Sequence, residues 1–165
     1  MSGRVTALYL ASAAGEPMRP HSEVRTAPGG MGLEGDRYAL ESGHWSTHRW
    51  EPVTLISAEA LEDVAQELGR TIDPASARRN LVTRGADLEA LVGQTFRVGE
   101  VTLEGTRPCD PCRYLEELSG IPGLLEALVG RGGLRAAIRS VGAIRVGDPV
   151  EIVEAAASAG VQEPP

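Results

Sequence analysis

The sequence predicts a mainly β domain of the α+β class, a compact, barrel-like fold with a few short helices outside. Most apolar segments are short and alternate with polar residues, and many of the 20 glycines stand between them. Short strands joined by glycine turns, with few helices, are typical of small closed or nearly closed barrels. The 165 residues suit one domain, which we place at residues 1–154, and we expect a disordered tail at residues 155–165.

The sequence predicts several short strands and one long polar segment. The clearest strands are residues 4–10, 53–56, 81–83 and 134–138. Residues 14–43 are rich in glycine, proline and polar side chains, and they predict a long loop with one strand near Val24. Loops of this length in compact domains are more often functional than accidental, so this loop is a candidate part of a site.

Helical patterns are fewer. Ser57 can cap a helix that continues to about residue 68, where Gly69 ends it. Asp73-Pro74 predicts a second, short helix with aspartate as its cap and proline at its first position. Two further segments, residues 114–118 and 122–129, look helical.

Two segments of the last half resemble each other. Residues 92–100 and 141–148 each contain a glycine turn, an arginine and then Val-Gly followed by an acidic residue. The match is too short to prove a duplication, and we expect two similar tight hairpins.

The charged residues exclude several function classes. The net charge of −7 argues against a general nucleic-acid binder, which is usually basic. All 16 positive residues are arginine, so the chain cannot hold pyridoxal phosphate through a lysine Schiff base or contain a Walker-type phosphate loop. Anions must therefore be held by arginine, by backbone N–H groups or by both, and the planar fork of arginine suits phosphate.

The sequence gives no sign of a membrane segment. No run approaches the apolar length needed to cross a bilayer, and residues 1–14 fit a first strand better than a signal peptide. We therefore expect a cytoplasmic protein without a membrane partner. Cysteines in that compartment are normally reduced, which favours a metal or catalytic role over a structural disulfide.

The most informative stretch is RPCDPCRYLE at residues 107–116. It contains the only two cysteines, Cys109 and Cys112, with two prolines among them and Arg107 and Arg113 on either side. A thiol between a strand end and a helix start meets positive charge, which favours a thiolate that acts as nucleophile or soft metal ligand. Two thiols at this spacing can also share a metal ion or form a redox disulfide, whereas the plainest alternative is two half-buried residues in a turn.

A glycine motif in the long loop is a weaker signal of a binding site. Gly30, Gly32 and Gly35 form a literal G-x-G-x-x-G, but polar residues precede it where a dinucleotide site needs a strand. A tight loop with close backbone approach, presenting Asp36 and Arg37, is the better interpretation.

A zinc site is a separate possibility in the sequence. His44 and His48, spaced H-x₃-H, could join the cysteine pair in a Cys₂His₂ site, although their order and separation differ from a zinc finger. A polar loop with two surface histidines is the simpler interpretation.

Several segments together resemble the MOSC domain, the module found at the C-terminus of eukaryotic molybdenum-cofactor sulfurases. The resemblance runs from about Val5 to Ile152. The number of matching segments and their order along the chain make it fairly specific. The segments are GLEGDR at residues 32–37, VTLISAE at 53–59, RNLV at 79–82, LVG at 91–93, FRVG at 96–99, RPCDPC at 107–112 and IRVGDPV at 144–150.

The resemblance implies a barrel-like fold with a pocket for the molybdenum cofactor, in a stand-alone, bacterial-type family member. The functional cysteine of the family follows a proline after a strand, which matches Cys112, as metal ligand or persulfide carrier. Cys109 is then an additional thiol that could resolve a persulfide or redirect the site towards zinc. Molybdenum sites commonly transfer oxygen atoms, so reduction of N-hydroxylated small molecules is an activity expected by analogy only.

The same resemblance assigns the remaining site residues. Arg78, Arg79 and Asn80 would hold the phosphate or pterin oxygens, although a basic turn in solvent is an equal alternative for the arginine pair. Backbone groups from Gly32 to Gly35, with Asp36 and Arg37, would complete the cofactor site. Pyridoxal phosphate, if involved, must sit on a partner such as a cysteine desulfurase, and a redox partner is the other expected protein.

A second hypothesis makes the chain a non-catalytic zinc-binding or adaptor domain. In that case Cys109 and Cys112, with or without His44 and His48, bind zinc instead of supporting molybdenum or sulfur chemistry. The sequence does not decide between the two hypotheses, which metal analysis separates. It also does not show whether the chain is an enzyme.

Overall fold

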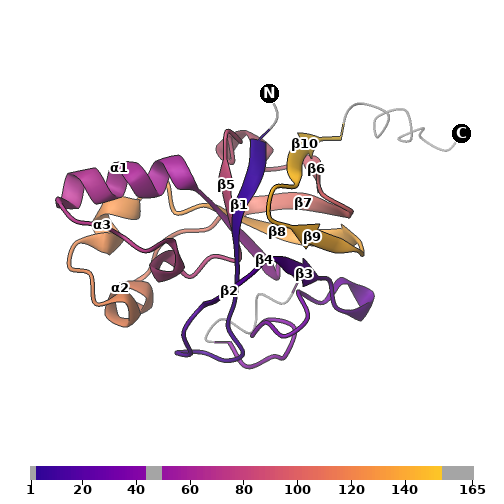
Figure 1. Cartoon of the computed structure of the whole chain (residues 1–165), viewed down its shortest axis with the longest axis horizontal. Coiled ribbons are helices and arrows are strands. Elements are labelled where there is room, and N and C mark those ends of the chain that lie inside the picture. The colour runs from indigo at the N-terminus through magenta and orange to yellow at the C-terminus, as the bar shows by residue number, and fades with distance from the viewer. Residues whose placement is uncertain (1–2, 44–49, 154–165) are drawn as a thin grey trace, which may run out of the picture.

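A computed structural model describes residues 3–43 and 50–153 of the chain. Seven of the described strands close a barrel (Figure 1), which confirms the predicted mainly β class. They are β1 (Gly3–Leu10), β4 (Val53–Ser57), β5 (Leu81–Arg84), β6 (Thr95–Val98), β7 (Val101–Pro108), β8 (Leu134–Ser140) and β10 (Pro149–Ile152). The predicted tail, residues 155–165, lies outside the described residues.

The barrel closes through its last strand. β10 pairs with β6 along one edge, where Val150 lies opposite Val98, and with β1 along the other, where Val150 lies opposite Gly3. Two short strands lie outside this ring: β2 (Arg19–His21) extends the sheet beside β1, and β3 (Glu23–Arg25) pairs with β9 (Ala143–Arg145). β3 is the strand expected near Val24.

The helices gather on one side of the barrel (Figure 1). They are α1 (Ala58–Leu68), α2 (Arg113–Ser119) and α3 (Leu124–Leu128). The 3₁₀ turns η1 (Pro28–Gly30), η3 (Pro74–Ala77) and η4 (Glu89–Leu91) lie in the connections between strands. The predicted boundaries of α1 are confirmed, because the Ser57 hydroxyl accepts from the Ala60 N–H at 2.9 Å and Gly69 follows in a left-handed conformation.

Two expectations about local structure need correction. Asp73-Pro74 starts only the single turn η3, because the chain leaves the helical region at Arg78 (φ 55°, ψ 38°). The residues 141–148 do not form a hairpin like that of β6 and β7. Instead β9 and β10 pair with different strands, since β10 must reach β1 to close the barrel.

Two apolar cores meet at the strands β4 and β5. These strands form the parallel pair of the barrel, and parallel strands are usually buried on both faces. Leu55 and Leu81 point into the barrel core, whereas Ile56 and Val82 face the helices. The site described below lies where the helical layer meets the barrel.

Truncation of the helical core should show how much this second layer stabilises the fold. Leu128 in α3 is fully buried, whereas its neighbour Val129 is 67% exposed. We expect Leu128→Ala to lower the free energy of unfolding by about 2–5 kcal/mol, because it removes buried methylenes and leaves a cavity. Val129→Ala should change it by less than about 0.5 kcal/mol. Urea denaturation of both variants measures this difference, and equal effects would contradict a packed helical layer.

Candidate functional site

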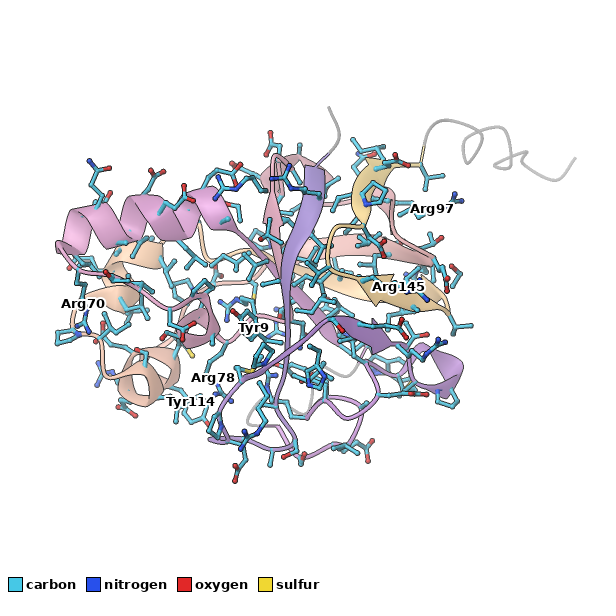
Figure 2. The ribbon with its side chains drawn as sticks, viewed as in Figure 1. Tyr9, Arg70, Arg78, Arg97, Tyr114 and Arg145 are labelled. Atoms are coloured by element: carbon cyan, nitrogen blue, oxygen red, sulfur yellow. The ribbon has the colours of Figure 1, made fainter. Side chains whose placement is uncertain are left out.

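A small cavity lies between the end of β7, the start of α2 and the loop that follows β1. It encloses about 50 Å³. Its walls contain four guanidinium groups, one carboxylate and one thiol. The lining residues are Ala14, Arg37, Tyr38, Arg78, Arg79, Asp110, Cys112, Tyr114, Leu115 and Arg135. Figure 2 shows Arg78 and Tyr114 together in this region, on the side that faces the helices.

The two cysteines occupy different environments. Cys112 lines the cavity as the residue that caps α2, and it packs partly against the helical core. Cys109 is 2% exposed and is not among the lining residues. No helical or turn residue lies between them, and Cys112 itself is extended (φ −139°, ψ 166°). Both thiols are free.

Residues 109–112, the cysteine loop, connect β7 to α2, and two glycines allow this loop to approach the barrel. A side chain at Gly132 would place its Cβ 2.4 Å from the carbonyl oxygen of Cys109, and one at Gly133 would meet the Leu55 oxygen at 1.9 Å. The Cys109 N–H donates to the Gly133 oxygen at 2.8 Å. The Gly-Gly pair thus fixes where the loop passes over β4.

Arg79 holds three backbone segments together. Its guanidinium donates to the carbonyl oxygens of Gly132 (2.9 Å), Ala77 (3.2 Å) and Cys109 (3.1 Å), and the residue is 8% exposed. The predicted anion-binding residue therefore lines the cavity, but much of its donor capacity positions the cysteine loop.

Arg78 has donor capacity left over. Its left-handed backbone is uncommon for a residue other than glycine and turns its side chain into the cavity wall. One terminal nitrogen, Nη1, donates to the Glu16 carbonyl at 2.7 Å, whereas the buried Nη2 has no partner within residues 3–43 and 50–153. Burial and then the nearby charge of Arg37 lower the pKa of Arg78 from its usual value. A bound anion would offset both the burial of the Arg78 charge and its repulsion by Arg37.

Arg135 is the second arginine with an unpartnered nitrogen. It enters the cavity from β8 and is 8% exposed, and its Nη1 has no hydrogen-bond partner in the part of the chain that the structure describes. Its Nη2 donates to the Tyr38 hydroxyl at 3.5 Å, and the Tyr38 ring lies between Arg135 (5.6 Å to the centroid) and Arg37 (4.7 Å). Burial, the largest single influence, opposes its charge, but attraction from Cys109, Tyr38 and Glu51 leaves the pKa of Arg135 raised.

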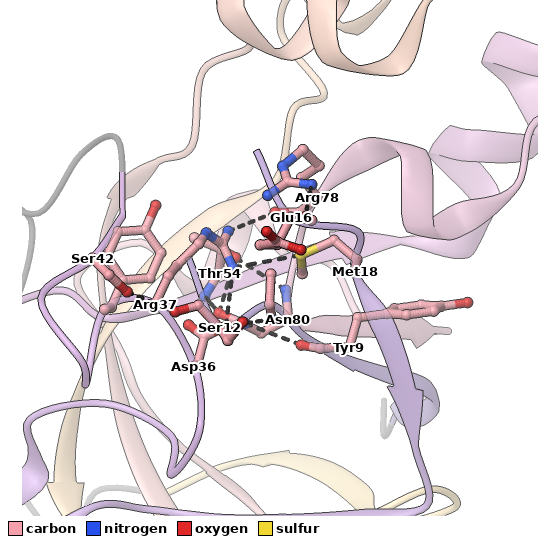
Figure 3. A network of polar contacts seen from close by, with 12 residues as sticks. Tyr9, Ser12, Glu16, Met18, Asp36, Arg37, Ser42, Thr54, Arg78 and Asn80 are labelled. Carbon is pink, nitrogen blue, oxygen red and sulfur yellow. Dashed lines mark hydrogen bonds and ion pairs between the residues drawn. The ribbon is translucent and has the colours of Figure 1, made fainter. Parts of the chain in front are cut away.

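Arg37 is neutralised by its neighbour, as Figure 3 shows. Its Nη1 donates to the buried Asp36 carboxylate at 3.0 Å, and its Nη2 donates to the Arg78 carbonyl at 3.1 Å. The same Asp36 oxygen accepts from the Ala11 N–H at 3.1 Å. Arg37 therefore fixes the backbone of Arg78, and Asp36 supports the site from outside the cavity lining.

Other predicted site residues lie away from the cavity. The buried Asn80 side chain accepts from the Thr54 N–H (3.1 Å) and donates to the Tyr9 carbonyl (3.1 Å), so it connects β4, β5 and β1. Gly32 and Gly35 are in the long loop and are not among the lining residues. Their contribution to a bound group would be indirect, through the position of neighbouring residues.

The residues proposed for zinc are only partly placed. His44 and His48 lie outside the described residues. Within residues 3–43 and 50–153, no group of three or more histidine, cysteine, aspartate or glutamate side chains is placed to hold a metal ion. The same part of the chain contains no helix long and apolar enough to span a bilayer.

Sequence reasoning missed Tyr38 and Arg135. A charged residue inside the otherwise apolar strand of residues 134–138 was the available signal for Arg135, because a buried arginine needs a partner or a ligand. Tyr38 gave no local signal, since its importance comes from Arg135, 97 positions away in the chain.

Thiol labelling should distinguish the two cysteines. Cys112 lines the cavity whereas Cys109 is buried, so iodoacetamide near neutral pH should alkylate Cys112 at least about tenfold faster. Peptide mass spectrometry over time measures both rates in one sample. Equal, slow alkylation would instead support a packing role for both residues.

Replacement of Arg79 should expose the buried thiol. Arg79→Ala removes three charged hydrogen bonds from buried carbonyls, so we expect a loss of roughly 3 kcal/mol in unfolding free energy and faster alkylation of Cys109. Arg78→Ala, which removes one bond to an exposed carbonyl, is the matched control and should leave Cys109 protected. If Arg79→Ala weakens anion binding without either change, Arg79 holds a ligand and not the loop.

The fold has known counterparts among solved structures. The YUAD protein from Bacillus subtilis has a TM-score of 0.76 at 18% identity, covering 92% of this chain and 96% of that one. YiiM from Geobacillus stearothermophilus (TM-score 0.72, 16% identity) covers 92% of this chain and 75% of its own. YiiM from Escherichia coli (0.67, 21%) covers 93% and 70% respectively. No curated protein matches the sequence.

The sequence itself matches a family model. The model is described as the MOSC domain, and it matches residues 43–151, which include β4 to β10 and both cysteines. The match extends over more than half of the chain and agrees with the order of segments noted in the sequence. The chain therefore belongs to the MOSC domain family.

Proposed function

We propose that the cavity binds the anionic part of a molybdenum cofactor, with the Cys112 thiolate as the soft ligand or sulfur-carrying group. One observation supports this most: Cys112 is the thiol on the wall of a cavity whose other polar groups are mainly guanidinium groups. Membership of the MOSC family, which is associated with this cofactor, gives the proposal its chemical identity.

The residues present fit such a group. Arg78 and Arg135 each have a buried nitrogen without a hydrogen-bond partner, which is the arrangement expected where a phosphate or another oxyanion completes the bonding. A thiolate is a ligand that soft metals prefer. The cavity is partly open to solvent, so the anionic or metal-bearing end of the cofactor would enter it with the rest of the cofactor towards the opening.

The arginines have distinct roles in the proposal. Arg78 and Arg135 donate to the bound anion, and Tyr38 orients Arg135 through its hydroxyl and its ring. Arg79 holds the cysteine loop in place, and Arg37 holds the backbone of Arg78. Tyr114 and Leu115, which follow Cys112 in the chain by two and three residues, also line the cavity.

The cofactor, when bound, supplies two-electron oxygen-atom chemistry. Reduction of N-hydroxylated bases is the activity to assay in the loaded protein, with a redox protein as the electron donor. If Cys112 instead carries a persulfide whose sulfur comes from free cysteine, a partner such as a cysteine desulfurase must supply it, because this chain has no lysine for pyridoxal phosphate.

Metal and pterin contents of freshly purified protein test this proposal. In a host that makes the cofactor, we expect wild-type protein to contain molybdenum and pterin. Cys112→Ser should lose the molybdenum, because a hydroxyl that stays protonated near neutral pH does not replace a soft thiolate. Cys109→Ser should retain most of it, since Cys109 does not line the cavity.

The two cysteine variants also test the zinc hypothesis. A zinc site built on both cysteines would lose a ligand in either variant, so both should release zinc to a similar extent. Such a result, with no molybdenum or pterin in wild-type protein, would refute the proposed function. Elemental analysis and pterin fluorescence of the three proteins side by side provide the comparison.

A further inference from the structure

We propose that the same cavity accepts a small free oxyanion bearing a sulfane sulfur, of the thiosulfate type, and transfers that sulfur to Cys112. The inference rests on the proposed function only in using Cys112 as the reactive thiol. It adds a substrate class and an activity that require no bound cofactor.

The first argument is the unmet hydrogen bonding of Arg135. This side chain is more than nine-tenths buried, lines the cavity, and leaves its Nη1 without a partner among the described residues. Leaving a buried charged donor unsatisfied is costly, so an acceptor of opposite charge belongs there. Arg78 Nη2 is also buried and has no partner among the described residues, and Arg78 lines the same cavity, so a bound oxyanion would have two candidate donors.

The second argument is size. The water-accessible space of the cavity is about 50 Å³, and one buried water needs roughly 10–15 Å³ of such space. The cavity is partly open to solvent, so this space suits the head of a small tetrahedral oxyanion such as thiosulfate.

The third argument is the thiol on the same wall. An oxyanion head held by Arg78 and Arg135 would leave the remaining substituent free to meet Cys112, which lines the same small space. Leu115 and Tyr114 beside it provide partly apolar surroundings, which suit a polarisable sulfur atom. Phosphate or sulfate would bind equally well but would have no sulfur to transfer, so they should act as inhibitors.

The transfer balances without a further reactant. The Cys112 thiolate attacks the outer sulfur of thiosulfate, and a new S–S bond forms as the S–S bond of thiosulfate breaks. The bonding electron pair leaves with sulfite, so one thiolate and one thiosulfate give one cysteine persulfide and one sulfite. The arginines stabilise the oxyanion throughout, and a low-molecular-weight thiol would later remove the persulfide sulfur.

Intact-protein mass spectrometry with sulfite analysis tests the inference. Reduced, cofactor-free full-length protein is incubated with thiosulfate, and we expect a gain of one sulfur atom on Cys112 with about one equivalent of sulfite. Methyl methanethiosulfonate, a neutral reagent that labels thiols without needing an anion site, reports the intrinsic reactivity of Cys112. The ratio of the two rates isolates recognition of the anion from reactivity of the thiol.

Arginine variants give the decisive comparison. Arg135→Gln and Arg78→Gln should each lower that ratio at least about tenfold, because each removes a charge-assisted hydrogen bond to the oxyanion. Arg139→Gln, on the same strand as Arg135 but paired with Glu104 at the surface, is the matched control and should leave it unchanged. If Arg135→Gln does not fold, as judged by circular dichroism, Arg78→Gln decides alone.

Several outcomes would overturn the inference. The inference fails if Cys112 gains no persulfide although the neutral reagent labels it. It also fails if the sulfur appears on Cys109 instead, or if neither arginine variant changes the ratio of the two rates. Phosphate and sulfate should inhibit competitively, and a lack of inhibition would also count against a shared anion site.

The cofactor proposal is judged separately. Molybdenum and pterin contents are measured on the same protein before the cofactor is removed. Persulfide formation in protein that never contains molybdenum would support this inference while refuting the proposed function, and molybdenum binding without persulfide formation would do the opposite.

Discussion

One buried guanidinium holds the candidate site together. Arg79 donates to carbonyl oxygens in three segments: the end of η3, the cysteine loop and the Gly132 turn before β8. These segments are far apart in sequence, and the hydrogen bond from the Cys109 N–H to the Gly133 carbonyl is a second link between two of them. Because the three bonds are buried and charged, the loop cannot move without leaving several polar groups unsatisfied. The position of Cys112 at the cavity wall therefore depends on Arg79 although Arg79 is not itself the reactive group.

The barrel explains why the cavity lies where it does. β4 and β5 run parallel and are covered on both faces, by the barrel core on one side and by the helices on the other. Asn80 fixes β5 to β4 and β1 just where β5 begins, so Arg78 and Arg79 leave the sheet at its edge. The helical layer then brings α2, with Cys112 at its start, against that edge. The arginine side chains and the thiol thus meet at the seam between the two cores.

The sequence predicts the fold class, the family and the reactive thiol from local signals. Glycine turns and short strands give the barrel, and a proline-rich segment between a strand and a helix identifies Cys112. The role of Asn80 was not predictable, because the residues Arg-Arg-Asn give no sign of which side chain points into the sheet. Tyr38 and Arg135 were missed for a different reason: their contact joins the long loop to β8, across 97 positions of the chain. Local patterns therefore identify the thiol that lines the cavity but not the charged groups around it.

The central claim is that the thiol of Cys112 and the unpartnered arginine nitrogens form one site for an anionic, metal-bearing group. Anomalous diffraction at the molybdenum edge, from crystals of protein purified with its cofactor, tests this claim most directly. The account predicts a molybdenum peak beside the Cys112 sulfur, in the cavity that Arg78 and Arg135 line. A peak elsewhere, or a zinc peak shared by Cys109, Cys112, His44 and His48 with no molybdenum signal, would contradict it.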